Sequence, residues 1–188
     1  VRIAGLVYMG ILITVLFVGG FIIPYIKNSL QQNISTSMKD VTTILGQSFD
    51  KQIDRSGANI VLTPITLRNS LASVKVNGLK SSYMYIINGS GNVAWHPNEK
   101  LIGEKIGISE VQNIVDKMVA KEKVSPGFLD YTYNGEQKHA VYFVSSTYSF
   151  TLVLCCDKSE INAPVNKMYT RTGIALIIIL IIMGIIGT

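Results

Sequence analysis

The two ends of the chain are continuously apolar, whereas the residues between them alternate between short apolar runs and polar turns. Residues 3 to 26 contain no charged side chain, and about 20 apolar helical residues are enough to cross a bilayer. A cleavable signal peptide has a shorter apolar core, of about 7–15 residues, and a small-residue cleavage site. The pattern therefore predicts a retained transmembrane helix over residues 1–26, with Pro24 tolerated near its end.

A second apolar run follows Arg171 and continues to the last residue of the sequence. Residues 173–188 are slightly shorter than a full span, so we interpret them as a truncated second transmembrane helix. A buried core helix is the alternative for either run, but the isoleucine-rich second run has no polar face. Two spans place both ends on one side of the membrane and residues 27–172 on the other. We expect this domain to lie outside the inner (plasma) membrane, in the periplasm or the exterior.

A long helix is expected to open the domain. Residues 25–55 contain no proline and a single glycine, Gly46, and their apolar side chains recur at steps of three or four residues. At 1.5 Å per residue this helix would be about 45 Å long. Its apolar stripe could pack against a sheet of the same chain or against the same helix of a second chain, and the pattern leaves both open. The stripe consists of Ile26, Leu30, Ile34, Met38, Val41, Leu45, Phe49 and Ile53.

Five short runs rich in β-branched and aromatic residues predict strands. These runs are 82–87, 92–95, 128–133, 139–146 and 149–156. The loops NGSG (88–91) and Asn134-Gly135 are typical of β-hairpins. A helix is predicted to start at Ser109, because Ser109 and Gln112 have the spacing of a capping box. We therefore expect an α+β domain with a five-stranded antiparallel sheet, helices on one of its faces and a long N-terminal helix.

Composition and motifs argue against several classes of function. The net charge is +5, from 17 Lys and Arg against 12 Asp and Glu, and no basic run suggests a nucleic-acid partner. Hydrolase, zinc-protease and phosphate-loop motifs are missing from the sequence, so we predict no enzyme activity, no catalytic residue, no metal and no cofactor. The adjacent Cys155 and Cys156 are expected to be two small hydrophobic residues of a strand, and not a disulfide.

Three segments resemble a known family. The run YMYIINGSGNVAWHPNEKLIGEKI, residues 83–106, is similar to the central motif of Cache domains, in which two strands flank a glycine turn and a His-Pro loop follows. GFLDYTYNGEQKHAVYFV resembles the later hairpin of these domains, and SFTLVLCCDKSEI resembles their last strand and exit helix. The chain thus resembles the single-Cache type, the extracellular sensor of methyl-accepting chemotaxis proteins and of some histidine kinases.

The resemblance implies a PAS-like fold in which a small molecule, often a short carboxylate or an amino acid, binds between the sheet and its covering loops. It also implies a homodimer packed along the long helices. The signal would pass through the second membrane helix to a cytoplasmic region beyond residue 188. In the dicarboxylate-sensing relatives an arginine lies three residues before the histidine, where this chain has Val93. This departure argues against a dicarboxylate ligand.

His96 follows the single tryptophan, Trp95, and is the first candidate ligand contact, because imidazole both donates and accepts hydrogen bonds. In the dicarboxylate sensors the matching histidine touches the ligand. His96 and Pro97 could equally close a strand, and the two roles are compatible. Tyrosines that share a strand face are further candidates, although tyrosine also favours sheets for its packing. The predicted ligand-binding residues are His96, Tyr83, Tyr85, Tyr131 and Tyr142.

Two other residues are lesser candidates. Lys138 could supply charge to an anionic ligand, and His139 is expected at a strand edge. Taken together, the sequence predicts a transmembrane chemoreceptor in which ligand binding shifts an equilibrium between two helix arrangements. Two alternatives stay open: the sensor region of a two-component histidine kinase, and a structural PAS-like membrane module without a ligand.

Overall fold

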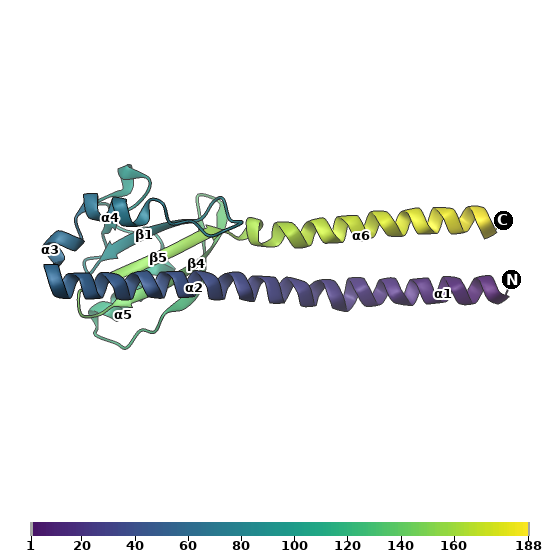
Figure 1. Ribbon diagram of the computed structural model, residues 1–188, viewed down its shortest axis with the longest axis horizontal. Helices are drawn as coiled ribbons and strands as arrows, with labels where there is room; N and C mark the ends of the chain where they lie inside the picture. The colour runs from purple at the N-terminus through teal and green to yellow at the C-terminus, as the bar shows by residue number, and fades with distance from the viewer. Residues whose placement is uncertain (1, 188) are drawn as a thin grey trace. The chain divides into compact units, whose positions relative to one another are not determined.

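The structure is a computed structural model and describes residues 2–187. The chain divides into two compact units, one formed by residues 1–33 and 161–188 and the other by residues 34–160. Two helices contribute to both units, α2 (Ile23–Ser56) and α6 (Lys158–Gly187). Figure 1 follows the elements along the chain from the N-terminus to the C-terminus.

The first unit opens with α1 (Arg2–Phe17), which continues through a π-helical turn, η1 (Val18–Ile22), into α2. The turn lies just before Pro24, which has no N–H for an i→i−4 hydrogen bond, and a π-helical turn is a common way to absorb that loss. The helix from Val7 to Ser56 is long and apolar enough to cross a membrane, by length and composition, and it is the one such helix among the described residues. The predicted span over residues 1–26 falls largely within it.

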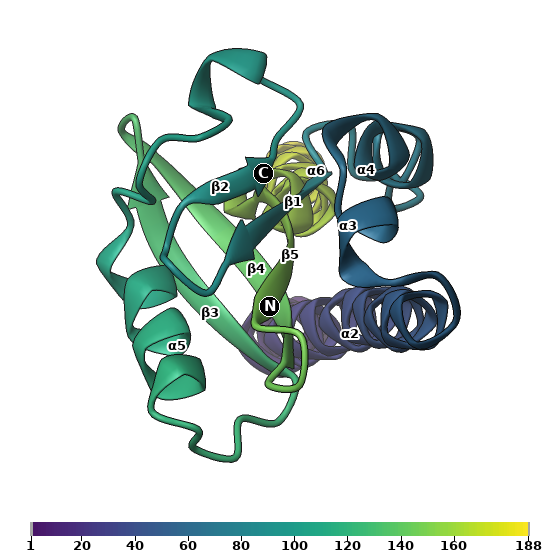
Figure 2. The same cartoon turned by 90° about the vertical axis from the view of Figure 1, so that its left-hand side faces the viewer.

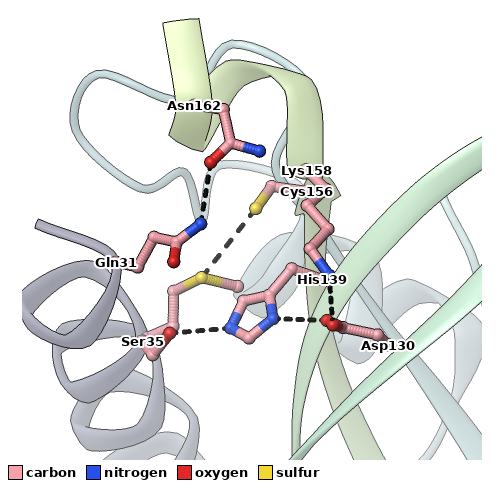
Figure 3. Close-up of polar contacts among 8 residues, drawn as sticks. Gln31, Ser35, Asp130, His139, Cys156, Lys158 and Asn162 are labelled. Atoms are coloured by element: carbon pink, nitrogen blue, oxygen red, sulfur yellow. Dashed lines mark hydrogen bonds and ion pairs between the residues drawn. The ribbon is translucent and has the colours of Figure 1, made fainter. Parts of the chain in front are cut away.

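The second membrane segment was predicted at residues 173–188. Residues 173–187 belong to α6, and Thr188 lies outside the described residues. Several isoleucines of α6, among them Ile174 and Ile181, are exposed. Within this unit, Gln31 Nε2 of α2 donates a hydrogen bond to Asn162 Oδ1 of α6 at 2.7 Å (Figure 3). The two-span arrangement stays a prediction.

The second unit is built on a five-stranded antiparallel sheet with the strand order β2-β1-β5-β4-β3. The strands are β1 (Tyr83–Asn88), β2 (Val93–Trp95), β3 (Gly127–Tyr133), β4 (Glu136–Ser145) and β5 (Phe150–Asp157). The remaining helices are α3 (Ala58–Val61), α4 (Pro64–Leu71), the short 3-10 helix η2 (Glu99–Leu101) and α5 (Ser109–Val119). The predicted α+β class, the five-stranded antiparallel sheet and the long N-terminal helix are confirmed.

The sheet carries helices on both faces, and not on one face as predicted (Figure 2). The unit's part of α2 packs on one face, while α5 packs on the other through Val111, Val115 and Met118. The central strand β5 is accordingly buried from Phe150 to Cys156. The prediction was wrong because an unbroken apolar run such as that of β5 indicates a strand covered on both sides.

The α2 face is closely packed around Gly46. A Cβ atom at this position would lie 2.1 Å from Cδ1 of the Phe143 ring, so only glycine lets helix and sheet approach this closely. Phe49 packs edge-on against Phe150, with the ring centroids 6.4 Å apart. At the other end of this contact, Met38 is fully buried.

The buried stripe of α2 differs from the predicted one at Val41. Val41 is exposed, and the neighbouring Thr42 is fully buried in its place. The Thr42 hydroxyl donates a hydrogen bond of 2.7 Å to the carbonyl oxygen of Met38 in its own helix, which satisfies the polar group without a partner from the sheet. Sequence periodicity missed this because threonine does not count as an apolar position.

Helix α5 begins at Ser109 but the predicted capping box is not formed. The N-cap residue is Ile108, whose side chain makes no capping bond. Ser109 Oγ donates instead to Glu110 Oε2, and Gln112 Nε2 donates to Asp116 Oδ1 at 2.7 Å. Ser109 is therefore the first helical residue and not the cap, a shift of one position that removes both bonds of the box.

Candidate ligand-binding pocket

A pocket opens on the face of the sheet that carries α5. The empty space at the pocket is about 400 Å³, a volume that includes open solvent at its mouth. Side chains of β1 and β3 and the loop that follows β2 line it. Its polar side chains are Tyr83, Tyr85, His96, Glu104, Lys105, Tyr131 and Tyr133.

Four of the five predicted ligand-binding residues line this pocket, and Tyr142 does not. Tyr142 is half-buried on β4, and its hydroxyl lies 2.5 Å from where a Cβ of Gly127 would be. Tyr133 lines the pocket instead. It lies two residues beyond Tyr131, on the same face of β3, so strand alternation was the signal that could have identified it. That these residues bind a ligand stays a prediction.

The pocket presents neutral phenol groups. The hydroxyl oxygens of Tyr85 and Tyr131 lie 3.3 Å apart in a buried hydrogen bond. Burial raises the pKa of Tyr83, Tyr85 and Tyr131 above the usual range of a phenol. Burial also raises the pKa of the neighbouring Cys155 thiol. These groups therefore stay protonated and uncharged at neutral pH, and each phenol keeps a proton with which to donate a hydrogen bond.

His96 orders the turn after β2 and also lines the pocket. The backbone N–H of Asn98 donates to His96 Nδ1 at 2.8 Å, which orders the turn at Pro97. Because Nδ1 accepts this bond, the proton of the neutral ring lies on Nε2. Burial lowers the pKa of His96, which favours the neutral form. The ring meets Tyr83 edge-on, with centroids 5.1 Å apart, so it adds an Nε2–H donor beside the phenols.

The loop after β2 is an ordered wall of the pocket. It folds back along β2, where Val93 N–H donates to the Glu104 carbonyl at 2.9 Å and Gly103 N–H donates to the Val93 carbonyl at 2.8 Å. Gly103 adopts a φ of +89°, a conformation that side-chain-bearing residues rarely take. Val93 itself lines the pocket, at the position where the dicarboxylate-sensing relatives carry arginine. At this position the pocket therefore presents an apolar side chain, while Lys105 is the cation of the loop that lines it.

The opposite face of the sheet carries a second polar cluster, drawn in Figure 3. His139 of β4 forms hydrogen bonds through both of its ring nitrogens. Its Nε2 lies 2.8 Å from the hydroxyl oxygen of Ser35 in α2, and its Nδ1 lies 2.7 Å from Oδ1 of Asp130 in β3. Lys158, the first residue of α6, donates to the other oxygen of Asp130 at 2.5 Å. Burial opposes the ionisation of Asp130, but the hydrogen bonds from Lys158 and His139 outweigh it and lower the pKa of the carboxyl group. The carboxylate is therefore ionised and binds both partners.

This cluster has the residue types of a hydrolytic triad without its surroundings. Ser35 lies inside helix α2, where neighbouring backbone N–H groups are engaged in helical hydrogen bonds and cannot stabilise an oxyanion. The cluster is therefore a structural link between α2, the sheet edge and the start of α6. Within the described part of the chain, no group of three or more His, Cys, Asp or Glu side chains is placed to hold a metal ion.

Comparisons with known proteins give matches among solved structures alone. No family model matches the chain, and no curated protein matches it. It is similar to the extracellular domain of mmHK1S-Z3, described as a histidine kinase, with 22% identity and a TM-score of 0.44 over 55% of this chain and 39% of that one. The ligand-binding domain of Mlp24 with asparagine has 19% identity and a TM-score of 0.39, over 54% of this chain and 38% of that one. The ligand-binding domain of the Pseudomonas fluorescens chemoreceptor CtaA with L-leucine has 17% identity and a TM-score of 0.34, over 52% of this chain and 38% of that one. The chain thus spans less than half the length of these structures.

Proposed function

We propose that this chain is the ligand-binding region of a membrane-anchored receptor that senses a small molecule outside the membrane. The observation that carries the proposal is the pocket, where Tyr83, Tyr85, Tyr131 and Tyr133 meet His96. The apolar helix that begins at Val7 supports the membrane anchor. Chemotaxis is the output we propose, and the sensor region of a histidine kinase would make the same use of this pocket.

The chemistry of the pocket favours a ligand with hydrogen-bond acceptors, such as a short carboxylic acid or an amino acid. Protonated phenols and an Nε2–H donor are matched by carboxylate oxygens. Val93, Leu101, Ile106 and Ile108 supply apolar contact for a short hydrocarbon body. Of the described lining residues, Glu104 is the one with a carboxylate that could pair with the ammonium group of an amino acid.

The test is a thermal-shift screen of the full chain in detergent against short monocarboxylates and amino acids. A ligand that binds only the folded state raises the free energy of unfolding, and with it the melting temperature. At a ligand concentration of a hundred times its Kd, the gain in free energy is about 2.7 kcal/mol. Glu104→Gln separates the two ligand classes, because it should weaken the binding of an amino acid and leave the binding of a monocarboxylate unchanged. A panel in which no compound raises the melting temperature would favour the structural module without a ligand.

A homodimer along α2 is part of the proposal. Ile44, with 66% of its surface exposed, and Val41 both lie on the face of α2 that the sheet does not cover. Burying such a patch against a second copy is favourable in proportion to the apolar area removed from water. Sedimentation of the full chain in detergent tests this, with Ile44→Asp expected to shift the mass toward that of a monomer. A monomeric wild type would contradict it.

A further inference from the structure

Two ion pairs hold the junction between β5 and α6. In one pair the junction contributes the acidic residue, and in the other it contributes the basic residue. Asp157, the last residue of β5, pairs with Lys138 of β4, and the next residue, Lys158, pairs with Asp130 of β3. Lys138 and His139 are adjacent in strand β4 and point to opposite faces. Because Asp130 bonds to His139, its pair with Lys158 lies on the other face of the sheet from the Lys138 pair. The Lys158 pair belongs to the cluster of Figure 3 and lies on the α2 face, whereas the Lys138 pair lies on the pocket face.

The Lys138 pair is closely connected to the pocket. Lys138 Nζ lies over the ring of Tyr83, 5.9 Å from its centroid, and Tyr83 lines the pocket. The pair is largely withdrawn from solvent, with 12% of the Lys138 side chain and 26% of the Asp157 side chain exposed. At such a site the charges are weakly screened, so an anion bound by the phenols competes with Asp157 for the ammonium group.

Asp157 has a second partner within reach. It directly precedes α6, which is the N-cap position, and a carboxylate there accepts hydrogen bonds from the first free N–H groups of a helix. In the structure its carboxylate pairs with Lys138 instead. A residue with two alternative partners can form a two-state element, and a ligand that favours one of the two partners would shift the equilibrium.

The other contacts of the junction would stay in place during such an exchange. Lys158 is held by Asp130, which His139 ties to Ser35 of α2. Glu160, in the first turn of α6, accepts hydrogen bonds from the backbone N–H of Ser81 at 3.0 Å and from its hydroxyl at 2.8 Å. If only the pocket-face pair is released, the start of α6 changes its orientation about these fixed contacts.

We infer that Lys138 couples the pocket to the exit helix: an anionic group bound by the pocket phenols draws Lys138 from Asp157, which then caps α6 and reorients its first turn. The inference rests on the proposed sensor function for the identity of the signal. The coupling itself is a property of the Lys138–Asp157 pair and is testable without a ligand.

The experiment uses the full chain in lipid vesicles with a reporter on its two helices. Gln31 and Asn162, which hydrogen-bond to each other, are changed to Gln31→Cys and Asn162→Cys, and the rate of disulfide formation under a mild oxidant reports their register. The chain's own Cys155 and Cys156 are buried and do not compete. In the absence of any ligand, Lys138→Gln is expected to change this rate at least threefold, while Lys123→Gln, the same change at an exposed lysine, leaves it unchanged.

A folded Lys138→Gln chain that reacts at the wild-type rate would overturn the inference, as would an equal change in Lys123→Gln. The double variant Lys138→Asp with Asp157→Lys keeps an ion pair, but its lysine cannot cap α6. Its disulfide rate is expected to equal that of the wild type and to stay unchanged when propionate is added. If Lys138→Gln does not fold, this double variant serves as the test of the coupling. A swapped chain whose rate responds to propionate as the wild type does would contradict the coupling.

Two probes separate this inference from the proposed function. Propionate and the uncharged propionamide are added to the wild-type reporter, and both the melting temperature and the disulfide rate are measured. If neither these nor other small acids raise the melting temperature, direct sensing fails, while the ligand-free rates still decide the coupling. If propionate raises the melting temperature but Lys138→Gln reacts as the wild type does, the sensor function stands and the coupling fails.

Discussion

The two faces of the sheet have the same strands but opposite surroundings. On the α2 face, Gly46 meets the Phe143 ring so closely that one added carbon would clash. On the α5 face, four tyrosines and His96 line an open pocket. A close-packed face transmits displacement because it cannot deform, whereas a face with a cavity can exchange solvent for a ligand. The α5 face is therefore the one with space for the proposed ligand, whereas the α2 face is closely packed.

The largest expected effect is on the packed face, from Gly46→Ala. In an open helix this change stabilises by up to about 1 kcal/mol, but here the new Cβ would meet Phe143 and overpacking costs about 1–3 kcal/mol. We expect a net loss of stability, measured by urea unfolding of the full chain in detergent. Gln47→Ala, at the next and exposed position, is the control and should change little. A stabilised Gly46→Ala chain would show that this face is not close-packed.

On the pocket face, substitutions should affect binding more than stability. Tyr131→Phe removes a hydroxyl that bonds to Tyr85, and loss of one such donor weakens a ligand by roughly 3- to 10-fold. Tyr142→Phe is the matched control, because Tyr142 shares the sheet face but does not line the pocket. Titration calorimetry with the best compound of the screen measures both. Equal losses in the two variants would contradict the boundary of the pocket drawn here.

Strand alternation predicted much of this site and failed where side chains compete for space. Tyr83, Tyr85 and Tyr131 were correctly placed together because residues two apart share a face. Tyr142 obeys the same rule, yet it is directed toward Gly127, a contact between neighbouring strands that no single-strand pattern contains. The position of the pocket wall depends on backbone bonds between residues ten or more apart, such as Val93 to Glu104, which the sequence does not reveal.

The helices show the same division between local and tertiary information. Periodicity correctly predicted the length of α2, because its residues avoid proline over several turns. It could not predict that Thr42 would be buried and Val41 exposed, since a buried threonine that bonds to its own helix does not count as an apolar position. The charge pairs at the start of α6 were also invisible to pattern, because Asp130 and Lys158 are brought together only by the order of the strands.

The two roles of His96 can be separated by comparing His96→Ala with His96→Asn. An asparagine side-chain oxygen can accept the Asn98 N–H and keep the turn, but it offers no donor at the position of Nε2. We expect both variants to weaken the ligand by about 3- to 10-fold, while only His96→Ala also lowers the melting temperature. Calorimetry and thermal unfolding provide the two readouts. Wild-type affinity in His96→Asn would leave His96 with the turn role alone.

The smallest expected effect is a pH dependence that originates on the pocket face. Burial lowers the pKa of His96 in the folded chain, so the neutral ring stabilises the fold fully above the unfolded value of about 6.5. This stability is lost as the pH falls through that value toward the lower folded pKa, because the unfolded chain then binds the proton more readily. The melting temperature of the wild type should therefore fall more steeply between pH 7 and pH 5 than that of His96→Asn. All other residues are identical in the two chains, so their contributions cancel in the difference, and parallel curves would mean that His96 is not buried as the structure has it.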